Sequence, residues 1–158
     1  MKYAYKTVDS PLGILKIVGS DTEIVALLWE NDDPKRVVIS AQVTQSDTPM
    51  LVKAATQIEH YFSKKRNTFD LPFTLYGSDF QKQVWQALMA VEYGTTVTYA
   101  QLAARIGKPN AARAVGHALG KNPLSIIVPC HRVIGAQGRI AGFAGGIRAR
   151  KFLLDLEK

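Results

Sequence analysis

The first part of the chain alternates between short apolar runs and turn-forming positions, which is the pattern of a small sheet. Residues 3–8 and 14–18 are strand-like, and the segment between them, SPLG at 10–13, has the chemistry of a turn. A third strand is expected at 24–29. The pattern therefore predicts a hairpin followed by a further strand.

A helix is expected to complete this first part. Residues 30–48 are polar and weakly patterned, so we expect a loop there, and the type of any element at 36–43 stays open. Thr48 then offers an N-cap oxygen, and Pro49 suits the first helical turn. Apolar residues recur at helical spacing as far as Phe62. We predict an α/β scaffold domain with a mixed sheet and a helix, and it carries no chemical motif.

The second part is predicted to be mainly helical, with well-marked helix ends. Two capping boxes, each a Ser or Thr followed three positions later by Gln, open its first helices: Ser78 with Gln81, and Thr98 with Gln101. Gly107 is expected to end the second of these helices. We expect Asn110 to cap a third helix over 111–119, which Gly120 stops. The predicted domains are 1–73 and 76–158.

The helices on either side of Gly107 have the dimensions of a helix-turn-helix. A helical hairpin that binds nothing has the same dimensions. The second of these helices is lined with small residues, and Arg113 is its one long cationic side chain. A thin helix can enter a narrow groove, and its arginine can fill a base stack or pair with a phosphate. Close packing of the small residues against another helix is the alternative.

Composition and charge narrow the class of protein. The chain has 158 residues, of which 47% are hydrophobic and 21% charged, as in a globular protein of one or two small domains. Its net charge of +7 is uneven, because residues 1–79 sum to −1 (9 Lys+Arg, 10 Asp+Glu) and residues 80–158 to +8 (11 and 3). A basic half indicates a polyanionic partner such as nucleic acid, although clustered solubility charge gives the same count.

The sequence also indicates a compartment. No apolar run reaches the length of a membrane span, and the charged start of the chain is unlike a signal peptide, so no membrane partner is expected. A single cysteine excludes an internal disulfide and a cysteine-rich zinc site, and no metal is expected. We therefore expect the protein in the reducing cytoplasm.

That cysteine, Cys130, is the main chemical candidate. A lone cysteine is commonly a small buried hydrophobe. Here Pro129 disfavours helix, while His131 and Arg132 place titratable or cationic groups beside the thiol, which favours the nucleophilic thiolate. Because neighbouring side chains of extended chain point in opposite directions, we expect His131 to reach the sulfur through water. We also expect the sulfur to be exposed.

Glu157 is the second chemical candidate. It lies at the C-terminal end of the last predicted helix, where the helix dipole disfavours an acid. A solvated chain end would explain it. A carboxylate that orients a histidine, in a nucleophile–base–orienter chain, is the chemical explanation.

Taken in order, these motifs resemble those of the O6-alkylguanine-DNA alkyltransferases. The matching segments are TYAQLA (98–103), AARAVG (111–116), NP (122–123), IVPCHRVI (127–134), which resembles the family's active-site signature, and GFAGG (142–146). The resemblance covers 71–158 and is fainter over 1–70. It implies a ribonuclease H-like α/β domain followed by a mainly helical domain with a winged-helix-like helix-turn-helix.

The resemblance also implies a reaction. O6-alkylguanine would be flipped out of double-stranded DNA, and its alkyl group would pass irreversibly to Cys130 in a single turnover. Glu157, His131 and a water would take the thiol proton, and Asn122 would hold the active-site turn. The remaining implied roles are hydroxyl donation and phosphate contact by Tyr99, substrate binding by Val133, Ala144, Phe143, Trp85 and Leu119, and DNA binding by Arg113, Ala112 and Lys121. No cofactor and no obligate protein partner are implied, and a monomer is expected.

Two other classes of protein stay open on the residues. A non-catalytic helix-turn-helix regulator would bind DNA but would have no use for Cys130. A cysteine hydrolase would turn over many times and would need neither the basic half nor Arg113.

Overall fold

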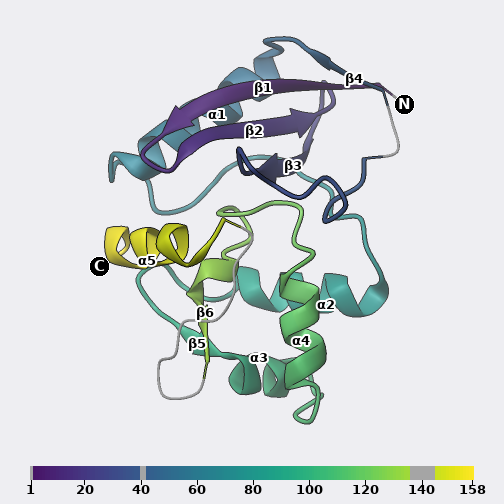
Figure 1. Ribbon diagram of the computed structural model, residues 1–158, viewed down its shortest axis with the longest axis vertical. Helices are drawn as coiled ribbons and strands as arrows, with labels where there is room; N and C mark the ends of the chain where they lie inside the picture. Colours follow the sequence, from purple (N-terminus) through teal and green to yellow (C-terminus); the bar gives the residue numbers. More distant parts are fainter. Residues whose placement is uncertain (1, 40–41, 136–144) are drawn as a thin grey trace. The chain divides into compact units, whose positions relative to one another are not determined.

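The computed structural model describes residues 2–39, 42–135 and 145–158. It divides the chain into two compact units, Met1–Tyr76 and Gly77–Lys158 (Figure 1). In each unit, the turn, capping and spacing patterns of that part of the sequence account for many of its elements.

The first unit is built on a four-stranded mixed sheet. Its strands are β1 (Lys2–Ser10), β2 (Gly13–Gly19), β3 (Ile24–Leu28) and β4 (Gln42–Gln45). They lie in the order β3-β2-β1-β4, with β2 antiparallel to both of its neighbours and β4 parallel to β1. The three predicted strands and their hairpin are confirmed. The fourth strand was not predicted, because it is largely exposed and has no apolar alternation of its own.

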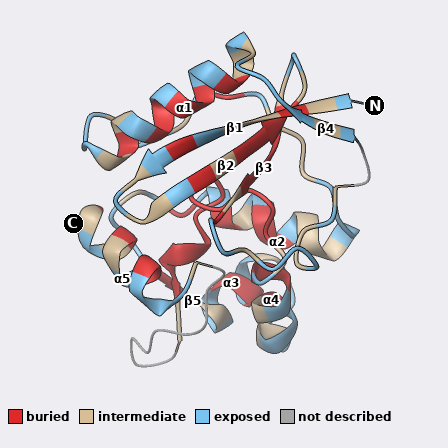
Figure 2. Cartoon of the chain, turned by 45° about the horizontal axis from the view of Figure 1, so that its top comes forward, coloured by how far each residue is buried: buried red, intermediate tan, exposed pale blue. Residues whose placement is uncertain are grey.

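One helix, α1 (Pro49–Phe62), packs on this sheet. The Thr48 hydroxyl accepts a hydrogen bond from the Leu51 amide at 3.2 Å, which confirms the predicted N-cap. Figure 2 shows that α1 has one buried and one exposed side, as its apolar spacing requires. The core of the unit lies between the buried side of α1 and the sheet, with Leu15, Ile17, Leu51 and Ile58 almost fully buried.

The second unit is mainly helical. Its elements are α2 (Asp79–Met89), β5 (Val97–Thr98), α3 (Tyr99–Arg105), α4 (Ala112–Leu119), the 3-10 turn η1 (Cys130–Arg132), β6 (Val133–Ile134) and α5 (Ile147–Leu156). Helices α2, α3 and α4 pack on one another, and α5 packs on η1. The two short strands pair in parallel, so Val97 lies opposite Val133. The mainly helical domain with a helix-turn-helix, α3 and α4, is confirmed.

Most of the predicted helix ends are present. Both capping boxes form. The hydroxyls of Ser78 and Thr98 accept from the backbone amides of Gln81 and Gln101, and the side-chain oxygens of these glutamines accept from the backbone amides of the two cap residues. Gly107 follows α3 with a φ of +76°, a left-handed conformation that favours glycine. The expected cap at Asn110 is wrong, because Ala111 occupies the N-cap position of α4. No side chain caps this helix, and the Ala111 amide donates to the Lys108 carbonyl.

None of the helices in the described part of the chain is long and apolar enough to cross a membrane. Among the same residues, no cluster of three or more His, Cys, Asp or Glu side chains is placed to hold a metal ion.

Candidate active site

Asn122 builds the turn that leads to Cys130. Its side chain is fully buried, its amide nitrogen donates to the Val128 carbonyl at 2.9 Å, and its Oδ1 accepts from the Leu124 amide at 2.9 Å. The Val128 amide also bonds to the Leu124 carbonyl at 2.8 Å. Both ends of the turn are therefore tied to one side chain, immediately before Pro129 and Cys130.

The same turn contains a strained residue. Ile126 has a φ of +75°, which is an outlier for a β-branched side chain, yet it is 1% exposed. Such a conformation costs on the order of 1–3 kcal/mol and persists only where its surroundings determine it. The hydrogen bonds of Asn122 supply that constraint, so the turn is held in one shape.

Cys130 opens the 3-10 turn η1 and is enclosed by the protein. Pro129 stands at its N-cap position, and the Cys130 carbonyl accepts from the Val133 amide. The residue is 5% exposed, so the expectation of an exposed sulfur is wrong. The apolar residues on the preceding turn, including Ile127 and Val128, are buried with it. Cys130 is therefore largely shielded from solvent.

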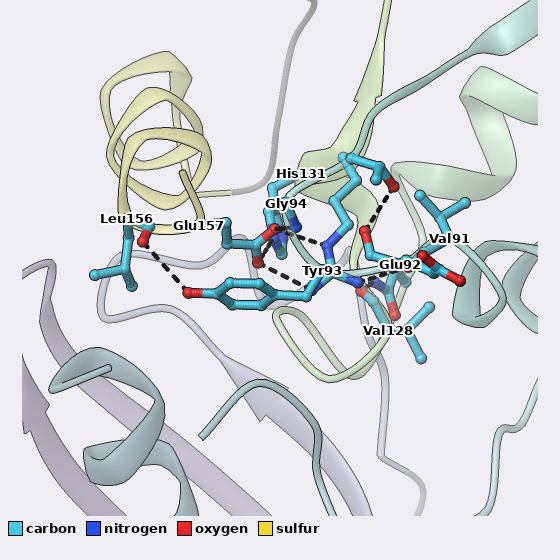
Figure 3. Close-up of polar contacts among 11 residues, drawn as sticks. Val91, Glu92, Tyr93, Gly94, Val128, His131, Leu156 and Glu157 are labelled. Atoms are coloured by element: carbon cyan, nitrogen blue, oxygen red, sulfur yellow. Dashed lines mark hydrogen bonds and ion pairs between the residues drawn. The ribbon is translucent and has the colours of Figure 1, made fainter. Parts of the chain in front are cut away.

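His131 and Glu157 form a buried pair. The His131 ring is fully buried, and its Nε2 lies 2.6 Å from Oε2 of Glu157, as the dashed line in Figure 3 marks. Glu157 follows the last turn of α5 and is 4% exposed. The other ring nitrogen, Nδ1, is buried and has no hydrogen-bond partner among the described residues. The carboxylate assigns the proton to Nε2, which leaves the Nδ1 lone pair as an acceptor.

Arg132 is bonded to Glu157, a contact that its place beside Cys130 in the sequence does not indicate. Its Nε and Nη2 donate to the two oxygens of Glu157 at 2.8 and 3.0 Å. Its Nη1 donates to the Val91 carbonyl at 2.7 Å. These contacts hold the guanidinium against the end of α5 and the carbonyl of Val91, both distant from Arg132 in the sequence.

Tyr93 and Gly94 form hydrogen bonds to the last residues of α5 and to Glu157. The Tyr93 hydroxyl donates to the Leu156 carbonyl at 3.3 Å, and the Gly94 amide donates to Oε1 of Glu157 at 3.4 Å (Figure 3). The Tyr93 ring also lies 5.7 Å from the Arg132 guanidinium carbon. Burial, and then the nearby Glu157 charge, raise the pKa of Tyr93, so the phenol keeps its proton and remains a donor.

Burial makes His131 a neutral base. Burial lowers the pKa of His131, the hydrogen bond and charge of Glu157 oppose this, and the charges of Arg132 and Arg150 lower it further. A neutral imidazole with its proton on Nε2 can accept a proton at Nδ1. His131 and Glu157 therefore form an imidazole–carboxylate pair with an open Nδ1, and His131 directly follows Cys130 in the chain.

The outer side of α4 has the features of a contact surface. Arg113 and His117 are exposed on it, one turn apart, and they lie beside a hollow of about 670 Å³. The hollow runs between α4 and the start of α2 and is lined by Ser78, Phe80, Gln81, Asn110, Ala111, Arg113, Ala114, His117 and Ala118. Arg113 is thus available to an external partner.

Tyr99 and Trp85 both pack against α4. The Tyr99 ring lies against the backbone of Gly116, where a Cβ would meet the ring at 3.5 Å. The Trp85 indole N–H donates to the Ala118 carbonyl at 3.0 Å, and the side chain is 1% exposed. Trp85 therefore joins α2 to α4 as part of the core.

The other predicted site residues divide between the core and the surface. Leu119 and Val133 are buried, while Ala112 and Lys121 are half-buried. Phe143 and Ala144 lie outside the described residues. The structure thus brings Asn122, Cys130, His131 and Glu157 into one network of turns around η1, and it places Arg113 on α4.

Comparisons with known proteins match both parts of the chain. Residues 3–75 match the ribonuclease-like domain of 6-O-methylguanine DNA methyltransferase, and residues 79–158 match its DNA binding domain. The methylated-DNA–protein-cysteine methyltransferase of Mycobacterium tuberculosis is 43% identical over 98% of this chain and 92% of its own length. The constitutive enzyme of that name from Bacillus subtilis is 41% identical over 98% of this chain and 94% of its own length.

The fold agrees as well. The crystal structure of the Mycobacterium tuberculosis OGT protein in complex with DNA is similar over all of this chain and 93% of that one, with a TM-score of 0.89 and 41% sequence identity. A structure of the Mycobacterium tuberculosis O6-methylguanine methyltransferase gives a TM-score of 0.86 at 42% identity, over 99% of this chain and 93% of that one. This chain therefore belongs to the 6-O-methylguanine DNA methyltransferase family, through both of the family's domains.

Proposed function

We propose that this protein repairs alkylated DNA by direct reversal, taking the alkyl group from O6 of guanine onto Cys130 once per molecule. The observation that carries the proposal is the buried base next to the single cysteine. His131 holds Glu157 through Nε2 at 2.6 Å and keeps Nδ1 as an acceptor. Membership of the family supports the same reaction.

The proposed transfer begins with a proton. The Cys130 thiol gives its proton through a water to Nδ1 of His131, and Glu157 stabilises the imidazolium through its bond to Nε2. The sulfur then attacks the alkyl carbon, so an S–C bond forms as the C–O6 bond breaks. The electron pair of that bond goes to guanine, which takes a proton on a ring nitrogen from the Tyr99 hydroxyl. The imidazolium proton returns to that hydroxyl through water.

This sequence of steps explains why the protein is spent. All protons and electrons are accounted for by the thiol, the lesion and the relay, so no cofactor is needed. The product is a thioether, which is not reduced by cellular thiols as a disulfide is. Each molecule therefore repairs one lesion.

The lesion has to reach a buried sulfur, which favours a flipped base over one that stays in the duplex. In the proposal, α4 lies in the groove of double-stranded DNA, where Arg113 fills the vacated stack and Ala112, Lys121 and Tyr99 approach the backbone. Extrusion costs a few kcal/mol and is cheapest for a mispaired base, which gives part of the selectivity. Val133, Ala144, Phe143 and Leu119 would enclose the extruded guanine, while Trp85 stays in the core and holds α2 against α4.

We further propose that the protein acts as a monomer in the cytoplasm. One copy carries the nucleophile, the base, the carboxylate and the basic helix, so no partner subunit has to complete the site. A sacrificial thiol has to stay reduced until it meets a lesion, which a reducing compartment ensures.

The test is to incubate the protein with duplex DNA that contains O6-methylguanine and to map the methyl group by peptide mass analysis. We expect one methyl group on the peptide that contains Cys130. Cys130→Ser should bind the same duplex and transfer nothing, because a neutral hydroxyl is a poor nucleophile. Loss of the DNA methyl group without a modified Cys130 would refute the proposal. If the protein binds the duplex and removes no methyl group, the result refutes the proposal and favours a non-catalytic helix-turn-helix regulator.

A further inference from the structure

We propose that Arg132 is a positioning residue that fixes the Glu157 carboxylate and keeps His131 an uncharged base at rest. This inference rests on the proposed function, in which His131 takes the thiol proton. It assigns to Arg132 a task different from the one its place beside Cys130 suggests.

The first argument is geometric. Arg132 approaches Glu157 with two N–H groups, Nε to Oε1 at 2.8 Å and Nη2 to Oε2 at 3.0 Å. This two-point contact fixes the plane of the carboxylate, which a single ammonium contact cannot do. The bond from Nη1 to the Val91 carbonyl at 2.7 Å holds the guanidinium itself in place. Oε2 is thereby aimed at Nε2 of His131.

The second argument concerns charge. The Glu157 side chain is 2% exposed and the Arg132 side chain 9%, so their charges are poorly screened by water. A buried carboxylate with only a neutral imidazole beside it would hold an uncompensated charge and would draw a second proton onto the ring. The Arg132 cation compensates that charge. The ring can then keep a single proton, on Nε2, and an open Nδ1.

The charged and titratable groups around the His131–Glu157 pair come from three elements of the described structure. Arg132 lies on η1, and Glu157 and Arg150 lie at the end and in the middle of α5. Tyr93 lies on the segment between α2 and β5, with its phenol protonated. Both arginine charges act against a charged ring, and Glu157 acts for it. Arg132 is bonded to both oxygens of the carboxylate.

The consequence is a resting site in which the His131 ring is neutral and its Nδ1 is open to a proton. In the proposed function, that proton comes from the Cys130 thiol through a water.

The direct test is the protonation state of His131 in the intact wild-type protein. Nitrogen-15 NMR of histidine-labelled protein reads both ring nitrogens, and the His131 signals are assigned by their absence in His131→Gln. We expect a protonated Nε2 and a bare Nδ1 at neutral pH. Two protonated nitrogens at neutral pH would overturn the inference. Because this measurement needs no substrate, it stands even if the methyl transfer itself fails.

The second test separates charge from structure. Single-turnover transfer rates on an O6-methylguanine duplex are measured against pH for the wild type, Arg132→Lys and Arg132→Met. In Arg132→Met the acid limb should move up by about one pH unit or more, because the ring then charges more easily. Arg132→Lys keeps the charge but not the two-point contact, so its acid limb should stay while its plateau rate falls.

Equal losses at every pH in both variants, with an unmoved acid limb, would mean that Arg132 is only structural and would overturn the inference. Circular dichroism and duplex binding establish that each variant is folded. If Arg132→Met does not fold, the NMR result and the Arg132→Lys profile decide the question. A wild type that transfers no methyl group to Cys130 contradicts the proposed function instead.

Discussion

At the scale of single residues, the burial of His131 links a proton to stability. Its pKa is lowered in the folded protein, chiefly by burial. As the pH falls below about 6.5, the unfolded chain takes up a proton that the folded chain does not. The free energy of unfolding should therefore fall in that range, by at most about 1.4 kcal/mol per pH unit, and level off below the folded-state pKa.

Urea unfolding at a series of pH values measures this decline. His131→Gln should flatten it, because the buried titrating group is gone. A decline of the same size in His131→Gln would show that another group is responsible.

Asn122 makes buried hydrogen bonds to the Val128 carbonyl and the Leu124 amide. Asn122→Ala should lower the free energy of unfolding by about 1–3 kcal/mol, the cost of leaving buried partners unsatisfied. It should also slow transfer, since the turn before Cys130 loses its brace. Asn110→Ala is the matched control, because Asn110 caps nothing, and its unfolding free energy should stay within about 0.5 kcal/mol of the wild type. Similar losses in the two variants would refute this role.

At the scale of helices and strands, the same substitution, glycine to alanine, should have opposite effects on stability at Gly107 and Gly116. Gly116 lies inside α4, and an added Cβ would meet the Tyr99 ring at an ordinary 3.5 Å, so Gly116→Ala should stabilise the protein by about 0.5–1 kcal/mol. Gly107 has a φ of +76°, so Gly107→Ala should destabilise it by about 1 kcal/mol although the space there is open. Thermal unfolding measures both. A destabilised Gly116→Ala would mean that the Tyr99 contact is tighter than the structure shows.

The helices and strands also show which parts of the structure can be predicted from the sequence. Capping boxes, the hairpin turn and the start of α1 depend on residues close in the sequence, and all were predicted. Strands β4, β5 and β6 were not, because each is short and is defined by a distant partner. In the site, Cys130 and His131 were named from their motif, and Glu157 from its place at the end of the last predicted helix. The contact of Arg132 with Glu157 was missed because it depends on how a 3-10 turn meets the end of α5.

At the scale of the whole molecule, charge separates the two parts of the chain. Residues 80–158 sum to +8 and residues 1–79 to −1, so we expect the second part to carry the electrostatic attraction to DNA. Arg113→Ala should lower the repair rate in duplex DNA about tenfold but leave transfer from the isolated O6-methylguanine base unchanged, since only the duplex requires extrusion. Rates on the two substrates measure this, with Arg105→Ala on α3 as the matched cation control. Equal losses on both substrates would remove Arg113 from extrusion.

The most direct test of the central claim is stoichiometry. Excess duplex containing O6-methylguanine is added to a known amount of protein, and both restored guanine and the intact protein mass are followed to completion. We predict that repair stops at one lesion per protein molecule and that every molecule has then gained one methyl group, absent from Cys130→Ala. Continued turnover, or restored guanine beside protein of unchanged mass, would contradict the account.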